Sequence, residues 1–192
     1  MIALPPHLGG TEFIAWRLDQ ARYAEGWDSG EGAYRGGGRW NSPGRRVVYA
    51  SLDAATAILE VAVHKGFDTL DLLPHVLTSL VIPDPSGIFV VQPSEIPDPA
   101  WLHPRYSDPA QTAFGDSVLD QHPLVLIPSA VSTASWNLLI APDRAAGRYT
   151  RRSQAPFSLD PRLVPPSPPA PDVAAPRPAR RRPRPRGPSA SR

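Results

Sequence analysis

The segment GGGRWNSPGRRVVYASLDAATAILEVAVHK, residues 36–65, carries the strongest structural signals of the chain. It opens with three glycines and a Ser-Pro-Gly turn. Residues 47–51, VVYAS, are β-branched and aromatic and are bounded by that turn, which predicts a strand. Residues 53–65 carry apolar side chains at helical spacing behind a capping serine or aspartate, which predicts a helix. We therefore expect a loop, a strand and a helix in direct succession.

Outside this segment, the apolar patterns predict mostly strands. These expected strands cover residues 11–18, 75–83, 87–91, 124–131 and 136–142. Residues 28–38 are rich in glycine and are expected to form a loop, whereas prolines interrupt residues 93–120 and leave that region unassigned. Several strands with few helices favour an α+β fold over a doubly wound sheet.

The composition excludes several classes of protein. The chain has 192 residues and no cysteine, which excludes disulfides, thiol nucleophiles and cysteine-ligated metals. No segment approaches the roughly 18 apolar residues of a membrane span, and the N-terminus lacks the pattern of a signal peptide. The five histidines do not have the spacing of metal ligands. We expect a cytoplasmic protein without a membrane segment or a metal site.

The charge is distributed unevenly and divides the chain at Leu163. Beyond it, seven arginines and one acid give +6, so the preceding body, with 13 basic and 17 acidic residues, carries −4. Residues 164–192 also contain ten prolines, which predicts a disordered tail behind a folded domain at 1–163. The tail's arginines either attract a polyanion weakly or form a solvated segment with no specific role.

Glu60 is the charged residue inside the predicted helix, which is otherwise apolar almost all round. Such a helix is usually buried, and a buried carboxylate needs a partner. Two interpretations follow: a catalytic carboxylate in a cleft, or a glutamate on the exposed stripe of the helix. His64 lies four residues further on, where it either orients Glu60 or complements the helix dipole.

Arg39 lies between the glycine run and Trp40. Glycines let the backbone approach a ligand closely, and the indole could hold the guanidinium by packing or by cation–π contact. The planar guanidinium suits phosphate oxygens. The segment lacks the endings of a Walker loop and of a Rossmann fingerprint. The alternative is a surface hairpin whose arginine pairs with an acid.

Two further residues have side chains suited to a site. Tyr49 ends the predicted strand next to the helix, where its ring could face a heteroaromatic ligand or belong to the core. Ser129 follows a proline within an apolar stretch, where its hydroxyl needs a hydrogen-bond partner. No G-x-S-x-G motif surrounds Ser129, which argues against a hydrolase nucleophile.

Taken in order, the segments resemble the RES domain family. The matching stretches are WRL (16–18), GGRWNSPGRRVVYAS (37–51), AILEV (57–61), IPSAV (127–131), NLLIAP (137–142) and FSLDPRL (157–163). The family is named for an arginine, a glutamate and a serine, which correspond here to Arg39, Glu60 and Ser129. Arg17 and Tyr49 fall at further positions that the family uses around its ligand.

The resemblance implies both a fold and a function. It implies an α+β domain with an ADP-ribosyltransferase-like split β-sheet, flanking helices and an NAD⁺ cleft. It also implies a toxin of a type II toxin–antitoxin pair, neutralised by an Xre-like antitoxin. The implied activity is cleavage of the nicotinamide–ribose bond of NAD⁺ by phosphorolysis or hydrolysis, or alternatively ADP-ribosylation of a protein. The sequence does not indicate which acceptor is used.

The resemblance also assigns roles to these five residues. Arg39, Glu60 and Ser129 are expected to be catalytic, while Arg17, Arg39, Tyr49 and Ser129 are expected to bind NAD⁺ as substrate, without a metal. On this reading Arg39 contacts the pyrophosphate, Glu60 stabilises positive charge on the ribose, Tyr49 stacks on nicotinamide and Ser129 holds an amide or a hydroxyl.

Overall fold

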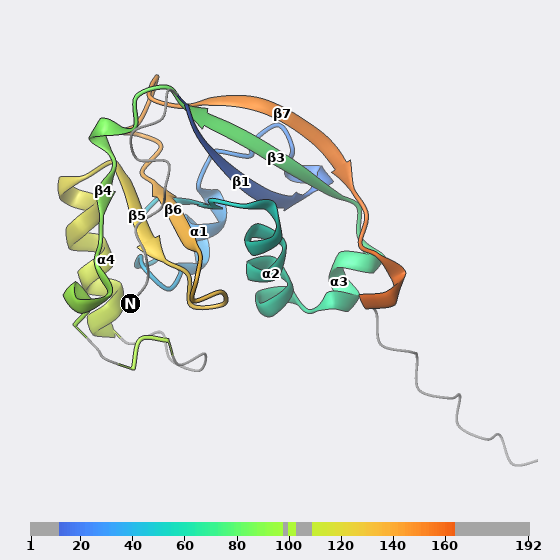
Figure 1. The fold of residues 1–192 in the computed structure, drawn as a ribbon, viewed down its shortest axis with the longest axis horizontal. Coiled ribbons are helices and arrows are strands. Elements are labelled where there is room, and N and C mark those ends of the chain that lie inside the picture. Colours follow the sequence, from blue (N-terminus) through green and yellow to red (C-terminus); the bar gives the residue numbers. More distant parts are fainter. Residues whose placement is uncertain (1–11, 98–99, 103–108, 164–192) are drawn as a thin grey trace, which may run out of the picture.

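The computed structural model describes residues 12–97, 100–102 and 109–163, so the predicted tail lies outside the described residues. Seven strands of this part form one sheet in the order β4-β5-β6-β2-β1-β3-β7 (Figure 1). The strands are β1 Phe13–Gln20, β2 Val48–Ser51, β3 His75–Ile82, β4 Phe89–Val90, β5 Leu124–Pro128, β6 Trp136–Ile140 and β7 Thr150–Phe157. The α-helices are α1 Glu31–Gly36, α2 Ala54–Lys65, α3 Phe67–Leu72 and α4 Pro109–Gln121.

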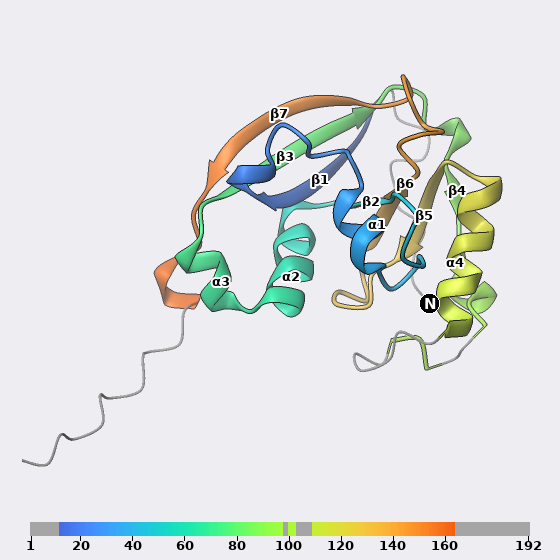
Figure 2. The ribbon, with the colours of Figure 1, turned by 180° about the vertical axis from the view of Figure 1, so that it is seen from behind.

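The sheet consists of two well-paired blocks that meet at a narrow seam between β1 and β2. β1 and β3 pair along their whole length, from Phe13↔Ile82 to Gln20↔His75. β1 and β2, in contrast, share the single register pair Trp16↔Ser51. In Figures 1 and 2 the block β1-β3-β7 consequently curves away from the block that contains β5 and β6. Beyond this pair β1 and β2 diverge, so side chains of both blocks can reach the space beside the seam.

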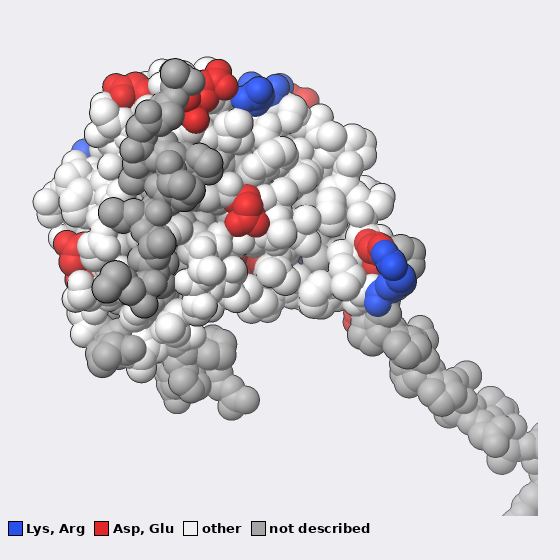
Figure 3. All heavy atoms as spheres, viewed as in Figure 1, with Lys and Arg blue, Asp and Glu red and all other residues white. Residues whose placement is uncertain are grey.

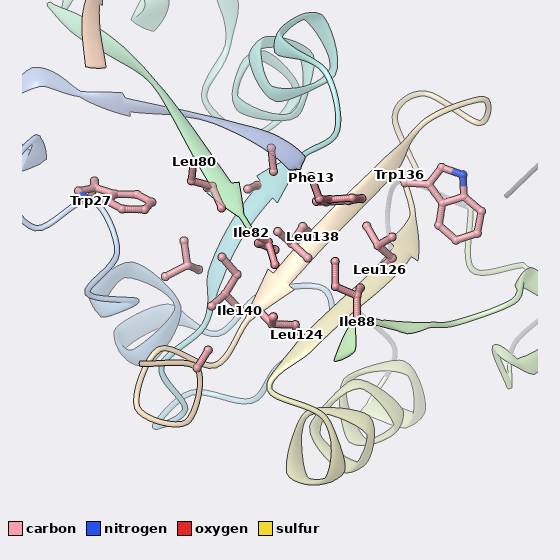
Figure 4. Close-up of a cluster of buried hydrophobic side chains, with 14 residues drawn as sticks. Phe13, Trp27, Leu80, Ile82, Ile88, Leu124, Leu126, Trp136, Leu138 and Ile140 are labelled. Atoms are coloured by element: carbon pink, nitrogen blue, oxygen red, sulfur yellow. The ribbon is translucent and has the colours of Figure 1, made fainter. Parts of the chain in front are cut away.

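The block that contains β5 and β6 is buried on both faces, which explains its continuous apolar sequence. Successive side chains of a strand point to opposite faces. Leu124 and Leu126 belong to the cluster shown in Figure 4, where they lie with Leu80 of β3. Val125 and Ile127 belong to a second cluster, on the side of α4. Each fully buried leucine stabilises the fold by about 1.5–3 kcal/mol. This block therefore supports the site with a stable, well-packed core.

Helix α2 begins behind Asp53, whose side chain accepts a hydrogen bond from the backbone N–H of Thr56. One side of the helix packs on β1 through Leu18 and Ala62. The other side is exposed, with 39% of Leu59 and 58% of Val63 accessible to solvent. The burial that is usual for so apolar a helix therefore holds for its inner face and not for its outer face. The surface over α2 carries few charged side chains (Figure 3).

The α+β fold class predicted from the sequence is confirmed, and each predicted strand overlaps a strand of the sheet, although β1 continues two residues beyond the predicted end at residue 18. Helices α3 and α4 and strand β7 were not predicted. β7, with the sequence TRRSQAPF, is mostly exposed at the edge of the sheet, so it has no apolar alternation and tolerates a proline. α4 lies in the region that prolines had left unassigned.

The predicted glycine-rich loop at 28–38 is partly wrong, because its second half forms α1, with the sequence EGAYRG. Two glycines in six residues hid this helix, since glycine is unfavourable inside helices. Gly37 has φ = +70° and ends the helix in a conformation that suits glycine. Within the described ranges, no helix is long and apolar enough to cross a membrane.

Candidate functional site

A cavity of about 310 Å³ lies beside the seam. Its walls come from β1, β2, α1, α2 and the turn that precedes Trp40, and they are completed by Ala130 and by Asn137 of β6. Four of the five residues singled out from the sequence line it: Arg17, Arg39, Tyr49 and Glu60. The fifth, Ser129, is fully buried and is absent from the lining, but it contacts Glu60. The fold thus brings all five residues to one place.

Glu60 faces the cavity from α2, and two uncharged side chains hold one of its oxygens. Oε1 accepts a hydrogen bond from Ser129 Oγ at 2.8 Å and another from Asn137 Nδ2 at 2.5 Å. Oε2 accepts no hydrogen bond from the described residues. The carboxylate is therefore fixed through one oxygen and available through the other.

Ser129 uses all of its hydrogen-bonding capacity within the protein. Its Oγ accepts from the backbone N–H groups of Val131, at 3.1 Å, and Ser132, at 3.0 Å. A hydroxyl has one proton, and here that proton is donated to Glu60. Among the described residues Ser129 therefore supports the carboxylate, and the contact with NAD⁺ expected from the resemblance stays a prediction.

Arg39 lies on a turn that packs tightly against Tyr49. A Cβ on Gly38 would lie 2.5 Å from the Tyr49 hydroxyl, so this glycine is required by the packing of the turn. Arg39 Nη1 donates to the carbonyl of Trp101 at 2.8 Å. In the described ranges Arg39 forms no ion pair with an acidic side chain. The alternative of a surface hairpin predicted that Arg39 pairs with an acid, and no such pair is found among these residues.

Trp40 does not stack on Arg39 in the way the sequence suggested. It is buried, and its ring packs against Trp101 at a centroid distance of 6.1 Å and against Phe114 at 6.5 Å. Helix α4 approaches it closely, since a Cβ on Gly115 would lie 2.2 Å from the Trp40 carbonyl oxygen. The indole therefore anchors the turn, while a backbone carbonyl holds the guanidinium.

Tyr49 braces the same turn through its hydroxyl. The hydroxyl donates to Asn41 Oδ1 at 2.7 Å and accepts from the backbone N–H of Trp40 at 3.2 Å. Burial raises the pKa of Tyr49 well above its ordinary value, so it remains a neutral phenol. Its ring lines the cavity, where it can still contact a planar ligand.

Arg17 differs from Arg39 because its charge already has a partner. Nη1 donates to the Tyr49 carbonyl at 2.8 Å, and Nη2 pairs with Asp19 Oδ1 at 2.6 Å. The first contact crosses the seam from β1 to β2. Arg17 consequently ties the two blocks of the sheet together as well as lining the cavity.

Sequence reasoning missed three polar residues of the cavity wall, Asp19, Ser51 and Asn137. A signal for Asn137 was present in WNLLI, where it is an amide among apolar side chains in a strand that is buried throughout. A buried polar side chain is more informative than an exposed apolar one. His64 also lines the cavity, but no hydrogen bond joins it to Glu60 in the described structure.

The arrangement defines a class of site. Within the part of the chain that the structure describes, an arginine without an acidic partner and a carboxylate with one open oxygen line the same cavity. The arginine can bind an anionic group such as a phosphate, and the carboxylate can stabilise positive charge that develops nearby. Such a cavity suits a ligand that carries phosphate and becomes cationic as it reacts.

Comparison with known proteins identifies the family. The family model described as "RES domain" matches residues 14–160, so the chain belongs to the RES domain family. "Toxin Res" of Photorhabdus laumondii is 31% identical over 154 residues, which cover 79% of this chain and 97% of that protein. "Prs ADP-ribosylating toxin" of Sphingobium sp. is 33% identical over 159 residues, which cover 78% of this chain and 95% of that protein.

A solved structure has the same fold. It is described as the crystal structure of the M. tuberculosis MbcT–MbcA toxin–antitoxin complex, and it matches with a TM-score of 0.63 and 20% sequence identity. The match covers 81% of this chain and 94% of that chain. The family predicted from the sequence motifs is thereby confirmed, and the seven-stranded α+β fold is shared with this structure.

Proposed function

We propose that this protein is the toxin of a type II toxin–antitoxin pair and that it depletes NAD⁺ by cleaving the bond between nicotinamide and ribose. One observation carries the proposal: Arg39 and Glu60 line the same cavity, and among the described residues Arg39 has no acidic partner and one Glu60 oxygen accepts no hydrogen bond. NAD⁺ carries a pyrophosphate for the cation and a ribose for the carboxylate. The names of the relatives from Photorhabdus and Sphingobium support the toxin class.

The cavity fits NAD⁺ in charge and in part in size. Ligand pockets usually measure about 300–1,000 Å³, and this one lies at the lower end at about 310 Å³. It can enclose the nicotinamide and ribose half, with the adenosine half extending outward. The Tyr49 ring would contact the nicotinamide, and Arg39 would bind the pyrophosphate as a planar fork.

In the proposed reaction, the glycosidic carbon–nitrogen bond breaks and its electron pair goes to the nicotinamide ring. The ribose carbon then bears oxocarbenium character until an acceptor oxygen attacks it. With phosphate as acceptor the products are nicotinamide and a phosphorylated ADP-ribose, and with water they are nicotinamide, ADP-ribose and a proton. Glu60 would stabilise the transient positive charge, a contribution of about 3–4 kcal/mol for a preorganised contact.

The second candidate is a protein ADP-ribosyltransferase that uses the same cavity. It is favoured by the name of the Sphingobium relative, "Prs ADP-ribosylating toxin". The chemistry at Glu60 is unchanged in this case, and the acceptor is a protein side chain. The partner that we propose for this chain is an Xre-like antitoxin, in line with the toxin–antitoxin complex that shares its fold.

The purified chain incubated with NAD⁺, with and without phosphate, tests the proposal. We expect release of free nicotinamide, and the mass of the second product identifies phosphate or water as acceptor. NAD⁺ that is consumed only when a protein substrate is added, with a matching gain in that protein's mass, would select the transferase. NAD⁺ that stays intact under all these conditions contradicts both candidates.

A further inference from the structure

We propose that Asn137 is a positioning residue for Glu60 and that Ser51 sets its orientation, so that the protein holds Oε1 and leaves Oε2 for the substrate. The kinetic consequence of this assignment rests on the proposed function. Its structural content, a chain of uncharged hydrogen bonds that fixes one carboxylate, can be tested without any substrate.

The sheet places these side chains side by side. Ser51 of β2 lies directly opposite Asn137 of β6, and Asn137 lies directly opposite Ile127 of β5. Residues two apart on a strand point to the same face, so Ser129, just beyond the end of β5, continues this row. Helix α2 then brings Glu60 to the same row. The register of the strands therefore creates a row of three uncharged side chains, of which Ser129 and Asn137 bind the carboxylate.

Ser51 determines which end of the Asn137 amide faces Glu60. Ser51 Oγ lies 2.8 Å from Asn137 Oδ1 and donates its proton there. An amide has an accepting oxygen and a donating nitrogen. Once Oδ1 is engaged by Ser51, Nδ2 points to Glu60 Oε1 and donates to it. Without the hydroxyl, the amide could rotate and present its oxygen to the carboxylate, which is repulsive.

The uncharged character of this row preserves the charge of Glu60. The cavity is also lined by charged or titratable side chains, namely Arg17, Asp19, Arg39, His64 and Lys65. In the described structure none of them forms an ion pair or a hydrogen bond with Glu60. A cationic partner would compete with positive charge on the substrate, whereas neutral donors orient the carboxylate and leave its charge available. This explains why serine and asparagine occupy these positions.

Two variants and a matched control test the row kinetically. Asn137→Leu removes the amide donor at similar shape without adding a charge, and we expect kcat for NAD⁺ cleavage to fall about 100-fold with KM changed less than about threefold. Ser51→Ala removes one buried hydroxyl, and we expect kcat to fall about 5- to 10-fold. The control is Ser79→Ala. Ser79 of β3 is as buried as Ser51, and its hydroxyl contacts that of Ser153 in β7 at 2.7 Å. It should leave kcat unchanged.

A spectroscopic measurement separates this inference from the proposed function. The chain contains five glutamates, so ¹³C-carboxyl labelling gives few signals, and Glu60→Gln assigns that of Glu60. We expect this signal to shift in Ser51→Ala and Asn137→Leu and to stay in place in Ser79→Ala. A wild type that leaves NAD⁺ intact refutes the function while these shifts still support the row. An unmoved Glu60 signal with unchanged kcat in Ser51→Ala overturns the row.

Discussion

The two charged groups of the cavity are held in opposite ways. Glu60 is fixed by Ser129, which follows β5, and by Asn137 of β6, and both donate to the same oxygen. In the described ranges the Arg39 side chain makes one hydrogen bond, from Nη1 to the carbonyl of Trp101. The carboxylate is thus preorganised, whereas the guanidinium can exchange one backbone carbonyl for a ligand.

This difference matches what each group would have to do. A charge that acts on a reacting bond is most effective when its orientation is set before the reaction. A cation that binds a pyrophosphate needs reach and free donors more than a fixed position. We therefore expect changes at Glu60 to act mainly on kcat and changes at Arg39 to act mainly on KM.

The largest effect is expected for Glu60→Gln. Glutamine is nearly the same shape, and its carbonyl oxygen can still accept from Ser129 and Asn137, but it has no negative charge. We expect kcat for nicotinamide release to fall about 10²–10³-fold, or roughly 3–4 kcal/mol, with the midpoint of thermal unfolding unchanged. Chromatographic assay of nicotinamide measures the rate, and turnover close to that of the wild type would remove Glu60 from the mechanism.

The next largest effect is expected at Arg39. Lysine keeps the charge but cannot offer a planar pair of donors, so we expect Arg39→Lys to raise KM for NAD⁺ about tenfold. Arg39→Ala should raise it further, with kcat falling less than KM rises. Steady-state kinetics measure both constants. A lower kcat at unchanged KM would show that Arg39 acts on the reaction step and would end the contrast with Glu60.

A moderate effect is expected for Tyr49→Phe. The change removes the acceptor of the Trp40 N–H and the donor to Asn41. A buried group left without a partner costs about 1–3 kcal/mol, so the free energy of unfolding should fall by that amount and KM should rise. Chemical denaturation measures the first effect. Tyr149→Phe is the control, because its hydroxyl makes one longer contact, at 3.3 Å to Asp28, and should cost less.

The smallest effect is expected for Asp53→Ala, which removes the cap of α2 and its bond to Ser135 at 2.7 Å. Loss of such a cap costs about 1 kcal/mol. Burial alone would raise the pKa of Asp53, but hydrogen bonds from Ser135 and Thr56 outweigh burial and lower it below the ordinary 3.8.

The sign of the resulting pH dependence follows from that lowered pKa. The stabilisation by Asp53 should be complete above about pH 4 and should be lost as the pH falls through the lower pKa of the folded state. Urea denaturation of the wild type and Asp53→Ala at pH 7 and at successively lower pH measures it. A stability difference that grows on acidification would contradict the assigned direction.

Local patterns predicted the parts of the fold whose apolar spacing is regular. The strand at 47–51 and the helix at 53–65 were placed within one residue of β2 and α2. β7 was missed because an exposed edge strand buries too little to show a pattern. The extent to which α2 is exposed was left open, because composition does not reveal how much of a helix its neighbours cover.

The residues of the site could be selected from the sequence, but the contacts between them could not. Motif resemblance selected Arg39, Glu60 and Ser129, but their contacts depend on register across strands that are distant in sequence. The Ser51–Asn137 contact joins residues 86 positions apart, which no local pattern encodes. The Trp101 carbonyl that holds Arg39 is likewise a backbone group that carries no sequence signal.

A crystal structure of the Glu60→Gln variant with NAD⁺ would test the central claim most directly, since this variant should bind the dinucleotide without cleaving it. We expect the pyrophosphate within hydrogen-bond distance of the Arg39 guanidinium and the nicotinamide-bearing ribose beside residue 60. NAD⁺ bound elsewhere, or bound in this cavity with its pyrophosphate remote from Arg39, would contradict the account.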